Sequence, residues 1–387
     1  MWQEEFDVSM IRRDNVVDRI LRSPLASEPS VLVSTPAGET LFQMGRTSRP
    51  VLGAETTKLT TTALVLREID RGTLTLDSVV NDLLPRESTE GLVVTRGRDW
   101  ANSITVEHLL RHVSGIPDYF TAPGRGDTSL FHQVLERDQK FSPDDAYRIA
   151  KQFTGHHPPG VTRRARTSFT AYRLLGDVLR ATTGMTLPQL IDLRIRPLGT
   201  LGDTLYVPNT TPSEWNLIAP LKMGQTSITL PLAFRSFGAD AGLTQSPLDL
   251  HATLALFRNA SMFHPDWVGR LWEKTTRLDR HGAAGLGVLV HRGPRLKGSS
   301  HRLHFVGMWS FTGVATLWET THDVFVTVAL NQLQDSGTAR ELAVDLTASL
   351  IRSGVLVPPD QREKLPLRMP QYVPPPNWNT LVSARKH

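Results

Sequence analysis

The chain has 387 residues and contains no cysteine. This absence excludes disulfide bonds, zinc sites with cysteine ligands and a thiol nucleophile. Long apolar runs are also missing, because no stretch approaches the roughly 18 to 20 residues that a membrane-spanning helix needs. The first ten residues, MWQEEFDVSM, are acidic and lack the apolar segment of a secretory signal. We therefore expect a cytoplasmic protein that does not insert into a membrane.

Charge of either sign is moderate and spread along the chain. Lys and Arg number 43 against 38 Asp and Glu, which gives a net charge of +5 and a pI near 9.6. Because the cations are scattered, the sequence predicts a mildly basic pocket rather than a nucleic-acid-binding surface. The 40% hydrophobic and 21% charged residues are typical of a globular chain large enough for two lobes. We expect a small-molecule substrate and no nucleic-acid partner, and the oligomeric state stays open.

Strand patterns occur at both ends of the chain, with helical patterns between them. SVLVSTP and ETLFQMG predict a hairpin around Pro36-Ala37-Gly38. Apolar spacing predicts a helix over 56–71 that ends at Gly72. Further strands are expected in AAGLGVLVHRG, RLHFVGMW, FTGVATLWET and DVFVTVALNQ, and helices over 8–23 and 336–352. Strands from both termini with helices between them predict one mixed, mostly antiparallel sheet of an α/β (α+β) fold, flanked by helices and joined to a helical lobe.

The expected domain boundaries follow from this layout. Residues 1–355 form one domain, with a sheet lobe built from 24–55 and 280–355 and a helical lobe over 56–279. Residues 356–387 form a Pro-rich tail, which includes VPPPNW.

Several passages, in order along the chain, resemble one known family. They are LREIDRGTLTLDSVVNDLLP, ITVEHLLRHVSGIPDY, PPG followed by TAYRLLGDVLRATTG, AGLTQSPLDLHATLALF, GLGVLV and FTGVATLWE. Together they resemble the serine β-lactamase and penicillin-binding-protein superfamily, in its class C-like and esterase branch. The resemblance runs from about Ser30 to Arg352 and implies a β-lactamase/transpeptidase-like fold.

The resemblance also places the three short motifs that carry the family's acyl-serine chemistry. Its Ser-x-x-Lys motif aligns with Glu55 and Lys58, in GAETTK. Its Tyr-x-Asn motif falls on Thr167-Ser168-Phe169 and its Lys/His-x-Gly motif on Met308-Trp309-Ser310. A carboxylate could attack an acyl carbon only to give an anhydride, so the aligned residues do not support the acyl-serine mechanism.

The remaining chemistry centres on Glu55 and Lys58, which an i, i+3 spacing places on one face of a helix start. The main hypothesis is a non-hydrolytic enzyme, of isomerase, cyclase or lyase type, that acts on a small specialised metabolite with Glu55 as general acid/base and Lys58 as its partner. The alternative for the pair alone is a helix-stabilising salt bridge. Two other functions stay open: a silent small-molecule binding protein, or a residual hydrolase or acyltransferase that uses another hydroxyl (Ser168, Thr56 or Ser310).

Substrate contacts are expected from the other aligned positions and from an adjacent basic loop. The loop GVTRRARTSF carries Arg163, Arg164 and Arg166, and a guanidinium there could bind a substrate carboxylate or phosphate. The expected substrate-binding residues are Thr167, Ser168, Phe169, Met308, Trp309, Ser310 and Arg166. The alternatives are a solvated loop and ordinary core packing.

No metal or cofactor is expected. His108 and His112 lie four residues apart on a predicted helix, but no glutamate follows His108, so both are interpreted as structural. GAETTK lacks the second glycine of a phosphate-binding loop, and no G-x-G-x-x-G follows a predicted strand.

Overall fold

The computed structural model describes residues 28–122, 129–161, 164–199, 201–296, 302–333 and 336–356. All structural statements below concern these residues. The helix expected over 8–23, Arg163 and residues 357–387 of the expected tail lie outside them.

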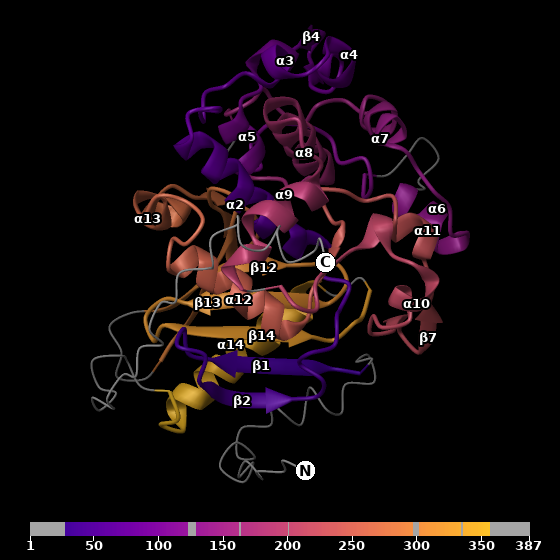
Figure 1. The fold of residues 1–387 in the computed structure, drawn as a ribbon. Coiled ribbons are helices and arrows are strands. Elements are labelled where there is room, and N and C mark those ends of the chain that lie inside the picture. Colours follow the sequence, from indigo (N-terminus) through magenta and orange to yellow (C-terminus); the bar gives the residue numbers. More distant parts are fainter. Residues whose placement is uncertain are drawn as a thin grey trace, which may run out of the picture.

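One eight-stranded antiparallel sheet carries strands from both ends of the described chain. In Figure 1 it occupies the lower half of the molecule, where the indigo strands β1 and β2 lie beside the orange strands of the C-terminal part. In sheet order the strands are β2 (Thr40–Met44), β1 (Ser30–Ser34), β14 (Val324–Ala329), β13 (Val314–Glu319), β12 (Arg302–Trp309), β11 (Leu289–Arg295), β10 (Gly282–Ala284) and β9 (Thr276–Arg277). The expected sheet is thereby confirmed, and every strand pair in it is antiparallel.

The central strands are buried on both faces, which explains their composition. Every residue of β14, with sequence VFVTVA, is buried. Such continuous runs of β-branched residues are typical of strands that are covered on both sides. Helices α14 (Ser336–Arg352) and α12 (Pro247–Arg258) both pack on this part of the sheet. The C-terminal helix has the bounds that the sequence predicts.

Helices and short loops of the central part of the chain form the second lobe, in the upper half of Figure 1. Its longer helices are α2 (Thr57–Asp70), α5 (Val106–Leu110), α6 (Leu130–Glu136), α7 (Pro143–Ala150), α8 (Phe169–Thr183), α9 (Leu187–Arg194) and α13 (Asp266–Glu273). Shorter helices are α3 (Val80–Leu83), α4 (Arg86–Thr89), α10 (Pro212–Trp215) and α11 (Pro231–Phe234). Three two-stranded ribbons pair β3 (Val94–Thr95) with β4 (Arg98–Asp99), β5 (Leu205–Tyr206) with β8 (Leu243–Thr244), and β6 (Leu221–Met223) with β7 (Thr226–Ile228).

Helix α2 lies between the two lobes and is buried along most of its length. Its sequence is rich in threonine, and these hydroxyls are paired with the surrounding chain. Thr61 Oγ1 donates to the Ala239 carbonyl at 2.7 Å, and Thr62 Oγ1 donates to the Gly287 carbonyl at 3.1 Å. Buried hydroxyls need such partners, because an unpaired one costs free energy. These bonds fix the position of the helix start, which carries Glu55 and Lys58.

Two further expectations concern membrane insertion and the division of the chain into lobes. No helix among the described residues is both long and apolar enough to span a bilayer. The division of the chain into a sheet lobe, a helical lobe and a tail stays a prediction.

Candidate active site

The approach to α2 is a strained turn. Glu55 lies in a 3₁₀ turn, η2 (Ala54–Thr56), directly before the helix. Ala54 has a φ of +44°, which a residue with a Cβ rarely adopts. Strain of this kind persists only where the surroundings impose it, and it concentrates at functional sites. The turn directs the Glu55 side chain toward the end of β12.

The Glu55 carboxyl group accepts a backbone hydrogen bond. The amide of Phe311, just beyond β12, donates to Oε2 at 3.2 Å. Burial raises the pKa of Glu55 to about 7, against the opposing effects of Lys58 and of the backbone amides of Glu55 and Phe311. Backbone N–H donors aimed at one position can stabilise a developing oxyanion. Here the carboxyl group of the protein itself occupies the Phe311 donor.

Lys58 is buried one turn further along. Its exposed fraction is 1%, and its Nζ lies 4.6 Å from the centroid of the Phe169 ring and 5.3 Å from that of Tyr172. Burial lowers the pKa of Lys58, whereas the charges of Glu55, Asp118 and Asp240 act in the opposite direction. In the described part of the chain, Lys58 and Glu55 are coupled through space and form no direct ion pair. The cation is held by ring faces, which attract it.

His112 lies next to this lysine, and both of its ring nitrogens lack a hydrogen-bond partner among the described residues. Its ring centroid is 5.1 Å from that of Tyr172. Burial and then the charge of Lys58 hold the pKa of His112 well below its usual value, so the ring is neutral. The helix predicted to carry both histidines ends at Leu110, and His112 has a φ of +56°. The placement of His108 and His112 on one helix is therefore wrong.

His108 has a structural role. Its ring accepts a hydrogen bond from the Thr105 amide, and Thr105 Oγ1 accepts one from the His108 amide, which caps α5. The described residues contain no group of three or more His, Asp or Glu side chains that could hold a metal.

The residues aligned with the second motif stand at the start of α8. Ser168 Oγ accepts the Ala171 amide and caps the helix, so this hydroxyl is engaged. The Phe169 amide donates to Asp118 Oδ2 at 2.5 Å, and its ring lies under Lys58. Thr167 and Arg166 are exposed. The structure thus brings Phe169 to Lys58, whereas Thr167 and Arg166 have no contact with Glu55 or Lys58.

The residues aligned with the third motif end β12. Met308 is buried in the core. The Trp309 ring packs under the guanidinium of Arg340, at 4.8 Å from its centroid, and so faces α14. Ser310 is fully buried, and its hydroxyl pairs with Thr312 Oγ1 at 2.6 Å. Among the described residues, none of these three side chains forms a hydrogen bond with Glu55. The group that reaches Glu55 is the amide of the next residue, Phe311.

A cluster of phenyl rings surrounds Phe311. Its ring centroid lies 5.5 to 6.4 Å from those of four others: Phe120, Phe131, Phe169 and Phe234. Edge-to-face and tilted pairs of this kind are favourable beyond their area. Phe169, which the sequence places in the expected aromatic wall, belongs to this cluster, whereas a wall that also includes Met308 and Trp309 stays a prediction.

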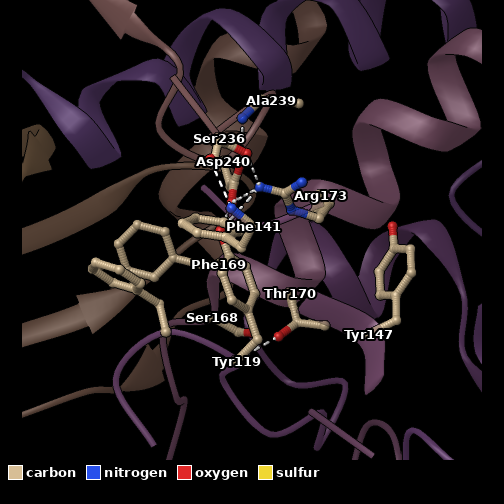
Figure 2. Close-up of polar contacts among 12 residues, drawn as sticks. Tyr119, Phe141, Tyr147, Ser168, Phe169, Thr170, Arg173, Ser236, Ala239 and Asp240 are labelled. Carbon is tan, nitrogen blue, oxygen red and sulfur yellow. Dashed lines mark hydrogen bonds and ion pairs between the residues drawn. The ribbon is translucent and has the colours of Figure 1, made fainter. Parts of the chain in front are cut away.

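Behind Phe169, α8 carries a buried polar network, drawn in Figure 2. Arg173 Nη2 donates to the Ser236 carbonyl at 2.8 Å and to the Tyr119 hydroxyl at 3.1 Å, and it lies 3.4 Å from Asp240 Oδ2. The Tyr119 hydroxyl donates to the same carboxylate oxygen at 2.5 Å. Burial, followed by the Asp240 charge, raises the pKa of Tyr119 well above its ordinary value. Asp240 thereby links this network to Lys58.

Comparison with known proteins assigns the family. The beta-lactamase family model matches residues 54–349, which is well over half of the chain. The chain belongs to the beta-lactamase family.

Relatives of this beta-lactamase family member include enzymes and a penicillin-binding protein. Penicillin-binding protein 4 of Amycolatopsis lactamdurans is 26% identical over 229 residues, which covers 55% of this chain and 49% of that protein. The chain thus spans about half the length of this curated relative.

Solved structures agree on the fold. The D-amino acid amidase of Ochrobactrum anthropi SV3, complexed with L-phenylalanine, is similar with a TM-score of 0.71 at 17% identity, over 89% of this chain and 98% of that one. EstCE1, described as a hydrolase with promiscuous acyltransferase activity, has a TM-score of 0.68 at 17% identity, over 88% and 98%. Proteins that share this fold thus include a D-amino acid amidase and a hydrolase with promiscuous acyltransferase activity.

Four residues of this beta-lactamase family member act on the candidate site without having been predicted from its sequence. They are Asp118, Tyr172, Asp240 and Phe311. Asp118 and Tyr172 lie within the passages that carry the family resemblance, and this position in the sequence could have identified them. Phe311 acts through its amide, which no residue pattern reveals.

The raised pKa of Glu55 predicts a pH-dependent effect of its removal. A carboxyl whose pKa is about 7 in the folded state and ordinary when unfolded favours folding at low pH, and this contribution is lost as pH rises from about 4.5 to 7. Glu55→Gln removes that titration. The melting temperature of the variant relative to wild type should therefore be higher at pH 8 than at pH 5, by a few degrees. Glu341→Gln, at an exposed position of α14, is the control and should show no such trend. An equal difference at both pH values would contradict the raised pKa.

Proposed function

We propose that the chain is a hydrolase or acyltransferase for small carbonyl compounds, in which Glu55 is the general base for an attacking water or alcohol. The chemistry of the amidase and hydrolase relatives supports this class. The observation that carries the role of Glu55 is its buried carboxyl group, which accepts the Phe311 amide and whose pKa burial raises to about 7. A general base works best when its pKa lies near the working pH.

The hydroxyls available for a covalent route are poorly placed. Ser168 Oγ caps α8, and Ser310 Oγ is paired with Thr312. Thr56 Oγ1 is buried without a hydrogen-bond partner in the described part of the chain, so no base is in contact with it. Since an activated hydroxyl needs an adjacent base, the attacking hydroxyl in the proposed reaction belongs to water or to an acceptor alcohol.

In the proposed reaction, water supplies the attacking oxygen, and Glu55 first takes up a proton and later returns it. The oxygen of water attacks the acyl carbon while one of its protons moves to the Glu55 carboxylate, and the carbonyl oxygen becomes an oxyanion. A carboxylate accepts hydrogen bonds more strongly than a carboxylic acid does. Proton uptake by Glu55 therefore weakens its hold on the Phe311 amide and frees that donor for the oxyanion. Glu55 then returns the proton to the leaving alkoxide or amine, and the carboxylic acid product is released.

Lys58 contributes through its charge. Its ammonium stabilises the Glu55 carboxylate before the attack, because the two groups attract each other. Burial lowers the pKa of Lys58 itself, and the Glu55 charge opposes that shift. Lys58 is assigned the task of setting the basicity of Glu55.

A second candidate is the proton-transfer enzyme of isomerase, cyclase or lyase type, which the same near-neutral carboxyl supports. A third is a binding protein without turnover. A panel of p-nitrophenyl esters and amino-acid p-nitroanilides distinguishes them. Hydrolysis supports the main proposal. Exchange of α-protons of a carbonyl compound in heavy water, without hydrolysis, supports the second. Absence of both activities supports the third candidate, a binding protein without turnover.

Covalent labelling tests the route. After incubation with a β-lactam or a fluorophosphonate, the intact mass of the protein should be unchanged, because Glu55 stands where the family resemblance places the nucleophile. An adduct on a serine or threonine would contradict the proposed mechanism. Glu55→Ser should not by itself give fast acyl transfer, since the groups at Thr167 and Met308 cannot supply a base. Brisk ester cleavage by that variant, with a labelled serine, would show that another residue does.

A further inference from the structure

A cavity of about 430 Å³ lies beside α8, and neither Glu55 nor Lys58 is among its lining residues. Its walls come from the start of α7, from α8, from the start of α9 and from residues 235–239. Four cationic side chains line it: Lys140, Arg173, Arg180 and Arg235. Asp177 is the one acidic residue in this lining. A concave site of this size holds a single small molecule.

Arg173 provides the strongest sign of a missing partner. Its exposed fraction is 6%, yet its Nε–H has no acceptor among the described residues. All of its hydrogen bonds are made by Nη2, as Figure 2 shows. A buried guanidinium donor without a partner carries a desolvation cost. An anionic oxygen in the cavity that Arg173 lines would remove that cost through a charge-assisted hydrogen bond.

The other charges of the lining leave the cavity electropositive. Among the described residues, the side chains of Lys140 and Arg180 form no hydrogen bond or ion pair, although the Arg180 charge acts on Asp177. Arg235 makes one long contact of 3.4 Å to Thr210 Oγ1. Asp177 already accepts a hydrogen bond from the Tyr147 hydroxyl. Burial raises the pKa of Asp177, which weakens its repulsion of an anion.

Flat apolar surface completes the walls. Phe141, Tyr206 and Phe237 line the cavity beside the cations. The Phe237 ring centroid lies 5.7 Å from that of Phe169, on whose ring Lys58 rests. Phe237 thus packs against the ring that holds Lys58 and also lines this cavity. Aromatic walls with a few convergent polar groups are typical of ligand sites.

We propose that this cavity binds a small anion that carries a carboxylate or phosphate group on a flat apolar body, and that it does so independently of Glu55. The anionic group contacts Arg173 and is attracted by Lys140, Arg180 and Arg235. The apolar body lies against Phe141, Tyr206 and Phe237. The competing explanation is a set of cations that face solvent without a ligand.

Isothermal titration calorimetry of the full chain tests the proposal with four probes: phenyl phosphate, benzoate, inorganic phosphate and neutral benzyl alcohol. Phenyl phosphate or benzoate should bind in the millimolar range or tighter. Inorganic phosphate should bind more weakly than phenyl phosphate, and benzyl alcohol should not bind. The order of phenyl phosphate and benzoate identifies which anionic group the site prefers. Absence of binding by both aromatic anions, or equal binding of benzyl alcohol, overturns the proposal.

Variants locate the site without disturbing the buried network. Arg180→Gln and Lys140→Gln alter exposed side chains, and together they should weaken binding of the preferred anion roughly tenfold. Arg86→Gln, an exposed cation on α4, is the matched control and should leave affinity unchanged. Glu55→Gln should also leave it unchanged. An affinity that the double change does not alter, or that Glu55→Gln strongly alters, places the anion elsewhere and overturns the proposal.

Discussion

Turnover should fall by about 100- to 10,000-fold when Glu55 is replaced with glutamine, because that is the usual contribution of a general acid or base. Glutamine keeps the size of the side chain and can still accept the Phe311 amide, but it cannot take up a proton. The measurement is kcat/KM for the best p-nitrophenyl ester found for the wild type. In the wild type, kcat/KM should rise with pH through an apparent pKa near 7, which is the value of the Glu55 carboxyl. In the variant this step should be absent.

Two comparisons make the result specific to Glu55. Glu341→Gln changes an exposed glutamate on α14 and should retain wild-type kcat/KM. Lys58→Met should lower activity as well and should couple with Glu55→Gln in a double-mutant cycle, because the two charges interact. A purely structural salt bridge predicts lower melting temperatures with activity preserved. Wild-type activity in Glu55→Gln would end the role proposed for this residue.

Removal of the Arg173 side chain should produce the largest loss of stability, about 3 to 5 kcal/mol in the free energy of unfolding. Asp240 is fully buried, and Arg173→Met leaves its carboxylate without the guanidinium. The Tyr119 hydroxyl and the Gly238 amide still donate to Asp240, but neither carries a compensating charge. Urea denaturation followed by circular dichroism measures the change.

The exposed pair Arg148 and Asp145 is the matched control, with a distance of 2.6 Å between Nη2 and Oδ1. Arg148→Met should cost less than about 1 kcal/mol, since water screens surface pairs. Combining Arg173→Met with Asp240→Leu should recover part of the lost stability, because the second change removes the unpaired charge. Equal losses in the free energy of unfolding for Arg173→Met and Arg148→Met would show that burial of the Arg173 network does not contribute to stability.

Local sequence patterns were sufficient to predict the overall architecture of the fold. The hairpin of β1 and β2 follows from two short apolar runs around a Pro-Ala-Gly turn, and α8 ends at Gly184, which adopts a φ of +70°. The predicted helix that carries His108 and His112 is shorter than its pattern, because the chain leaves helical geometry after Leu110. Tertiary packing outweighed local preference there.

The candidate site was predictable only where it is local in sequence. Glu55 and Lys58 are three residues apart, so the helix start places them together. Their other neighbours come from distant segments: Asp118 lies before α8, and the Phe311 amide follows β12. Trp309 shows the limit clearly. An alignment assigns it to the site, but side chains alternate along a strand and its ring faces Arg340 of α14.

The pairing of β1 with β14 has a consequence for biosynthesis. Ser30 lies opposite Ala329 in the strand register, so the first hairpin emerges from the ribosome long before the strand that completes it. Until then one edge of β1 offers unpaired backbone groups to any other nascent chain. Closure of so long a loop is slow, and the sheet cannot form until translation has nearly finished. Expression yield should therefore depend on chaperone supply more strongly than for a chain whose strands pair with their neighbours in sequence.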